Sequence, residues 1–130
     1  ALDTYSNGEL IAINQDPTGI AARRIVGGDL SYPCKDRHTD SSGAAACSNV
    51  WGRKLSDGYA LGFVNNAAST TRVVCDAHCF ALLLDGEKID KLHVRDLWAH
   101  NEVETIQRPF NFSSVVAGNG FATAYKLTKA

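Results

Sequence analysis

The sequence predicts an all-β fold, an antiparallel β-sandwich of about eight strands with a short N-terminal helix. Short segments rich in β-branched and aromatic residues follow one another, and turn signals separate them at the spacing typical of a sandwich or a barrel. Two apolar-rich runs also flank Asp57-Gly58, a dipeptide typical of hairpin turns. At 130 residues, the chain fits one domain that can bury a hydrophobic core.

Residues 5–14 are predicted to form the short helix. Ser6 and Asn7 are N-cap candidates, and Asp16-Pro17 ends the helix because a residue before proline is disfavoured in the α region. A helix of this length is unstable alone, so we expect it to dock on a larger body. Its docking face would be the apolar cluster of Leu10, Ile11 and Ile13.

Residues 1–19 are assigned to this helix and its exit turn, and residues 20–130 to the sandwich. Residues 31–48 form a loop that is unusually long for a compact domain. The expected strands cover residues 20–30, 49–65 as a hairpin, 70–75, 80–84, 93–98, 103–116 as two pieces broken at Pro109, and 120–128.

The hairpin of residues 49–65 is predicted to close through a two-residue type I′ turn at Asp57-Gly58, because both residue types tolerate positive φ angles. This turn would place Gly52 opposite Phe63 and Trp51 opposite Val64. Gly52 would then leave room for the phenyl ring.

Four cysteines, Cys34, Cys47, Cys75 and Cys79, allow three disulfide pairings. We expect Cys34–Cys47 and Cys75–Cys79, each of which closes a short local loop and contributes about 2–3 kcal/mol. The alternative is a four-cysteine zinc site, but the two spacings are unequal and one is too long for a zinc knuckle.

The cysteine count and the sequon Asn111-Phe112-Ser113 favour an oxidising, secretory route, with Asn111 as a glycosylation site. Methionine is absent, so we expect that residues before Ala1 were removed as a signal peptide, a propeptide or a larger domain. The expected location is extracellular, lysosomal or vacuolar.

The net charge of −1 gives no electrostatic reason to expect nucleic acid or a membrane surface as a partner. No apolar run approaches the roughly 20 residues that span a bilayer. The four histidines show no metal-ligand spacing, and Gly118-Asn119-Gly120 lacks the third glycine of a dinucleotide loop. No metal and no cofactor are expected.

Several stretches, in this order, resemble the C-terminal part of glycoside hydrolase family 27, the α-galactosidases and α-N-acetylgalactosaminidases. Glu9–Gly19 is similar to the signature found where the catalytic barrel of that family ends. Val50-Trp51 with Leu55–Gly58 resembles the first hairpin of its C-terminal sandwich, and Val94–Trp98 resembles a later strand. Cys75–Phe80 resembles a short disulfide loop of animal members, whereas residues 31–48 read as an insertion.

The resemblance implies a β-sandwich that packs against a (β/α)8 barrel. In that family both catalytic aspartates lie on barrel strands N-terminal to this region, and no residue here matches their motifs, so no catalytic residue is assigned. The chain alone is expected to be inactive, as a fragment or processed chain of a glycosidase. The alternative is a stand-alone secreted module that binds carbohydrate or assembles with further copies of itself.

Four aromatic residues are candidates for stacking on sugar rings, since flat apolar sugar faces pack on aromatic rings. The competing interpretation places them in the sandwich core, where large aromatic side chains dominate burial. These residues are Trp51, Trp98, Tyr59 and Tyr125.

Overall fold

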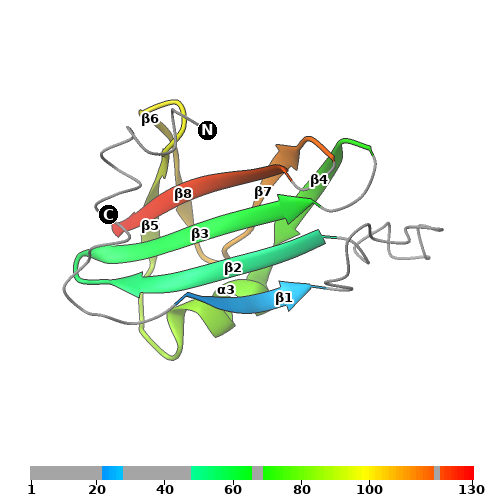
Figure 1. Ribbon diagram of the computed structural model, residues 1–130. Helices are drawn as coiled ribbons and strands as arrows, with labels where there is room; N and C mark the ends of the chain where they lie inside the picture. The colour runs from blue at the N-terminus through cyan, green and yellow to red at the C-terminus, as the bar shows by residue number, and fades with distance from the viewer. Residues whose placement is uncertain (1–21, 28–47, 66–68, 119–120) are drawn as a thin grey trace.

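The computed structural model describes residues 22–27, 48–65, 69–118 and 121–130 (Figure 1). The predicted helix over residues 5–14 lies outside these ranges, as do Cys34 and Cys47. The described elements are β1 (Arg23–Gly27), β2 (Ser48–Leu55), β3 (Gly58–Asn65), β4 (Thr71–Cys75), α3 (Ala77–Leu84), β5 (Lys91–Asp96), β6 (Asn101–Gln107), β7 (Phe112–Val116) and β8 (Phe121–Lys129).

The described strands form two antiparallel sheets. The larger sheet has six strands in the order β1-β2-β3-β8-β5-β6, and the smaller one pairs β4 with β7. Figure 1 shows β4, β7 and α3 behind the six-stranded sheet, so that one face of this sheet is covered. α3 packs against β1, β2 and β4. The predicted fold class, an antiparallel β-sandwich, is therefore confirmed.

The core lies between the two sheets, where three aromatic rings from different strands meet. The Phe112 ring of β7 lies 6.0 Å from the Phe63 ring of β3, and 4.8 Å from the Tyr125 ring of β8. Phe63 and Tyr125 pack edge to face at 5.7 Å. Each such pair contributes about 0.5–1.5 kcal/mol beyond the burial of its area. These rings therefore join the small sheet to the large one.

The β2–β3 hairpin forms as expected, but its predicted register is wrong. Leu55 pairs with Gly58, so the two loop residues are Ser56 and Asp57, and Gly58 is the first residue of β3. Neither loop residue has a positive φ, which excludes a type I′ turn. Glycine is needed in the strand because a Cβ on Gly58 would collide with the backbone carbonyl of Leu127 on β8.

The shifted register also changes the partners that were predicted within the hairpin. Trp51 faces Gly62 rather than Val64, and Gly52 faces Leu61 rather than Phe63. A Cβ on Gly52 would meet the side chains of Ile25 and Leu83. The glycine thus makes room for β1 and α3 and not for a phenyl ring.

Residues 80–84 were predicted to be a strand, and they belong instead to helix α3. Asp76 is the N-cap, and its carboxylate accepts a hydrogen bond of 3.0 Å from the Cys79 backbone N–H. The Cys75–Cys79 disulfide ties the end of β4 to the first turn of the helix. The buried positions follow a helical spacing and not the alternation of a strand: Cys79, Phe80, Leu83 and Leu84.

A charged cluster connects the hairpin to the turn after α3. Lys54 forms an ion pair with Glu87, and its ammonium lies 4.9 Å from the centre of the Tyr59 ring. The hydrogen bond from Lys54 holds the pKa of the Glu87 carboxyl below its usual value. Burial raises the pKa of the Tyr59 phenol well above its usual value, and the neighbouring Glu87 carboxylate adds to this shift.

Gly58→Ala should lower the free energy of unfolding by about 1–3 kcal/mol, because the added methyl group meets a backbone carbonyl that cannot move aside. Gly62→Ala in the same strand is the matched control, since its nearest neighbour would be the Thr123 carbonyl oxygen at 3.8 Å. The control should be neutral or stabilising by up to about 1 kcal/mol. Urea unfolding measures both, and equal effects would contradict the role given to Gly58.

Tyr59→Phe should reduce the loss of stability at alkaline pH. Above about pH 10 the tyrosine ionises in the unfolded chain, whereas the raised pKa keeps Tyr59 protonated in the fold. The unfolded state then binds fewer protons, so the stability of the wild type falls as the pH rises through this range. Urea unfolding at about pH 9 and about pH 11 measures the difference. The same alkaline loss in both proteins would show that Tyr59 is not responsible.

Candidate functional site

The structure does not bring the four candidate sugar-stacking residues together. Tyr59 and Tyr125 are only 2% and 7% exposed and belong to the core, which is the competing interpretation. Trp51 and Trp98 are exposed, but Trp51 lies on β2 and Trp98 in the turn after β5, and β3 and β8 lie between β2 and β5. These four residues therefore do not form one aromatic platform.

A groove of about 560 Å3 with many polar side chains lies between the two sheets and is here called the inter-sheet groove. β4 and β7 supply one wall, β8 supplies the floor, and β5 and β6 supply the other wall. Its polar side chains are Arg72, Asp96, Glu104, Asn111, Ser113, Ser114, Thr123 and Tyr125.

Hydroxyl groups form the floor of the inter-sheet groove. The Ser114 Oγ lies 2.8 Å from the Thr123 Oγ1 and 2.8 Å from the Tyr125 hydroxyl, so three hydroxyls from β7 and β8 are linked. Ser114 is 5% exposed and shares the core-facing side of β7 with Phe112 and Val116. A serine is tolerated at this buried position because its hydroxyl has two hydrogen-bond partners.

Charged groups stand on the walls of the groove. The Arg72 guanidinium donates a hydrogen bond of 3.0 Å to the Ser113 Oγ on β7. On the opposite wall, one oxygen of the half-buried Asp96 accepts the backbone N–H groups of Trp98 and Ala99, each at 2.9 Å. Glu104, on β6, is exposed. The groove thus combines hydrogen-bond donors, acceptors and hydroxyls that can do both.

The opposite, outer face of the six-stranded sheet carries a strip of small apolar residues beside an exposed indole. Trp51 pairs with Gly62, which pairs with Ala124, so the indole borders two positions with minimal side chains. We call this set the outer strip, and it consists of Trp51, Ala60, Gly62, Val64, Ala122 and Ala124.

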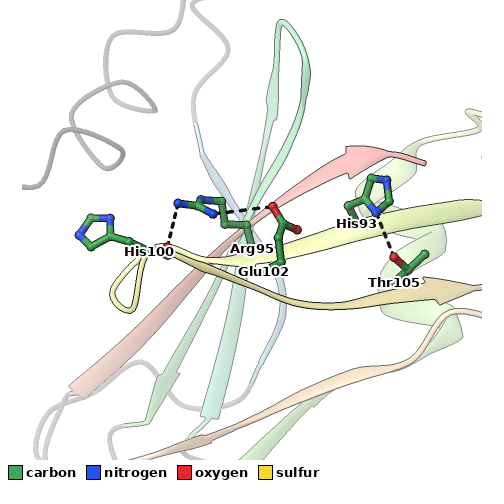
Figure 2. A network of polar contacts seen from close by, with 5 residues as sticks. All are labelled: His93, Arg95, His100, Glu102 and Thr105. Carbon is green, nitrogen blue, oxygen red and sulfur yellow. Dashed lines mark hydrogen bonds and ion pairs between the residues drawn. The ribbon is translucent and has the colours of Figure 1, made fainter.

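Polar pairs cover the same outer face at the β5–β6 edge, as Figure 2 shows. The His93 Nδ1 lies 2.9 Å from the Thr105 Oγ1, and the Arg95 guanidinium lies 3.7 Å from the Glu102 carboxylate. Arg95 also donates a hydrogen bond of 2.9 Å to the His100 carbonyl. Charged residues on an edge strand such as β6 oppose pairing with another sheet.

The other predicted site residues are placed as follows. The Cys75–Cys79 disulfide has the pairing that was expected. Asn111 is exposed and lines the inter-sheet groove, directly before β7. Within the described ranges, no three His, Cys, Asp or Glu side chains are grouped to hold a metal ion. No helix in this part of the chain is long and apolar enough to cross a membrane.

A second hollow, of about 500 Å3, lies between α3 and the segment around Pro109. Its base consists of apolar side chains, including Phe80, Leu84 and Phe110, and Lys88 and Arg108 stand at its rim. Most of its polar groups are already engaged, as the Arg108 Nε donates to the Ile89 carbonyl at 2.6 Å. This hollow offers few polar groups for recognition.

Of the residues that line the inter-sheet groove, only Tyr125 and Asn111 were predicted site residues, and neither was predicted to belong to a groove. The lining residues come from five strands that are distant in sequence, so no local motif marks them. One signal was present: Ser114 interrupts the apolar side of β7 between Phe112 and Val116. A serine at a core position indicates a buried hydrogen bond and the margin of the core.

Comparisons with known proteins agree with this architecture. Residues 46–124 match the family described as the alpha galactosidase C-terminal beta sandwich domain. The chain is 29% identical over 103 residues to alpha-galactosidase 3 of Arabidopsis thaliana, a match that covers 78% of this chain and 20% of that protein.

Solved structures share the fold. The α-galactosidase of Saccharomyces cerevisiae superposes with a TM-score of 0.73 at 15% identity, over 97% of this chain and 36% of that one. A family 27 β-L-arabinopyranosidase of Geobacillus stearothermophilus gives 0.70 at 14% identity, over 99% of this chain and 24% of that one. The chain thus spans about a third or less of these relatives. It belongs to the family of α-galactosidase C-terminal β-sandwich domains.

Proposed function

We propose that this chain is the non-catalytic sandwich of a family 27 glycoside hydrolase and that it supports a catalytic barrel. The observation that carries this proposal is the family match, together with the small share of each relative that the chain covers. The larger remainder of those proteins leaves room for a separate catalytic domain. The chain would then be a fragment or a processed part of such an enzyme.

The carboxylates of the described residues support a non-catalytic role. A retaining glycosidase needs two carboxyl groups about 5 Å apart across one sugar, one of them protonated at working pH. Asp96 and Glu104 line the same groove, but Glu104 is exposed and one Asp96 oxygen is occupied by two backbone N–H groups. Glu87 has a lowered pKa, which is unsuited to a general acid.

The outer strip is the surface that we propose docks on the barrel. Small side chains let another element approach the sheet closely, and the Trp51 indole, 37% exposed, can anchor the contact. An apolar sheet face of this kind is normally covered in a larger protein. The cluster of Leu10, Ile11 and Ile13 remains a second predicted contact for the same partner.

We also propose that the protein passes through the secretory route. The Cys75–Cys79 disulfide is of a kind that persists in oxidising compartments, and the exposed Asn111 is accessible for glycosylation. The second candidate function, a stand-alone module that binds carbohydrate, is favoured by the exposure of Trp98, which is 41%. Its ring is available to a ligand without any change in the core.

The purified chain should not hydrolyse an aryl α-galactoside, because the carboxylates of the described residues do not supply the opposed acid pair that the reaction needs. Release of the aryl group, measured by absorbance, would contradict the non-catalytic assignment. This assay separates the proposed role from that of a complete enzyme.

Ala124→Glu should abolish the association of the chain with the barrel portion of a family 27 enzyme, because it places a charge in the centre of the outer strip. Val74→Glu is the matched control, since Val74 is 44% exposed on the small sheet. Co-purification of the two separately produced parts measures the effect. Equal retention of both variants would show that another surface makes the contact.

A further inference from the structure

We propose that the inter-sheet groove binds a neutral sugar unit, at a site separate from the outer strip. The groove has a volume of about 560 Å3, within the range of small-molecule sites. It exists because the two-stranded sheet covers only part of the six-stranded one. The edge of β7 that does not pair with β4 is therefore uncovered, and it lines the groove together with β8, β5 and β6.

The density of hydroxyl groups at the floor points to a polyol. The linked hydroxyls of Ser114, Thr123 and Tyr125 can each donate and accept, as sugar hydroxyls do. Tyr125 is held rigidly by its ring contacts with Phe63 and Phe112, so its hydroxyl position is fixed before any ligand arrives. A pre-organised floor lowers the entropy cost of binding.

The walls of the groove add further hydrogen-bond acceptors and donors. The Glu104 carboxylate, and the Asp96 oxygen that the Trp98 and Ala99 N–H groups do not use, can accept bonds from sugar hydroxyls. Arg72 supplies donors from the other wall. Two exposed apolar side chains also line the groove, Val103 at 46% and Val115 at 54% exposure, and they can pack against the C–H face of a sugar ring.

Charge selects a neutral ligand over an anionic one. One guanidinium stands against two carboxylates, so a uronate or a phosphate would meet net repulsion. The Arg72 guanidinium is also partly engaged by its hydrogen bond to the Ser113 hydroxyl. Within the described residues, no grouping of acidic side chains suits a metal ion.

The test is a titration of the isotope-labelled chain with D-galactose, D-glucose and D-galacturonate, followed through backbone amide shifts. At least one neutral hexose should give saturable shifts at Ser113, Ser114 and Thr123 below about 100 mM, the range of a weak monosaccharide site. Galacturonate should bind more weakly than galactose.

Glu104→Ala should weaken the neutral hexose by about tenfold, because it removes a charged acceptor from the wall. Glu102→Ala on the same strand should leave the affinity unchanged, since Glu102 pairs with Arg95 outside the groove. Arg72→Gln, on the opposite wall, provides a second variant, and thermal unfolding checks that all three remain folded.

Three results would overturn the proposal. The first is the absence of saturable shifts with every neutral hexose. The second is saturable shifts confined to Trp51 or Trp98, which would place the sugar on an exposed indole. The third is equal affinity of galacturonate and galactose, which would remove the charge argument. The first and third results do not bear on docking to a barrel, so this proposal can fail while the docking proposal stands.

Discussion

The contact between Phe63, Phe112 and Tyr125 holds this sandwich together, because the small sheet has only two strands. A two-stranded sheet is marginal in water, and β4–β7 persists only while it is packed on a larger body. The buried rings from β3, β7 and β8 provide the contact between β4–β7 and the larger sheet. The hydroxyls of Ser114 and Tyr125 lie at the edge of this aromatic cluster. The edge of the core is therefore also the floor of the inter-sheet groove.

The alternation of apolar and polar residues was sufficient to predict most of the strands and the fold class. Along β8, for example, Tyr125 and Leu127 share the buried side as the pattern indicates. The prediction was wrong for residues 80–84, because a run of five apolar residues has no period of its own. The structure resolves the ambiguity through the cap at Asp76 and the adjacent disulfide, which start a helix there. The hairpin register was wrong because Gly58 is required by β8, a strand more than 60 residues later.

The candidate site was less predictable than the fold, for a related reason. Four aromatic residues were predicted as candidates for sugar stacking. Whether an aromatic ring can contact a sugar depends on its burial, and its burial depends on which strands become neighbours. Tyr59 and Tyr125 face the core, whereas Trp51 faces outward from β2, opposite Gly62 on β3. The groove combines side chains from β4 to β8, and only the sheet order brings them together. A serine on the apolar side of β7 was its one local sign.

The central position of β8 has a consequence for how the chain assembles during synthesis. β8 follows every other strand in sequence, yet it lies between β3 and β5 and joins two halves of the sheet, β1–β3 and β5–β6. Until β8 leaves the ribosome, β3 and β5 each present an unpaired backbone edge. Such edges can recruit strands from neighbouring chains, so pairing with β8 removes an aggregation hazard from the nascent sheet.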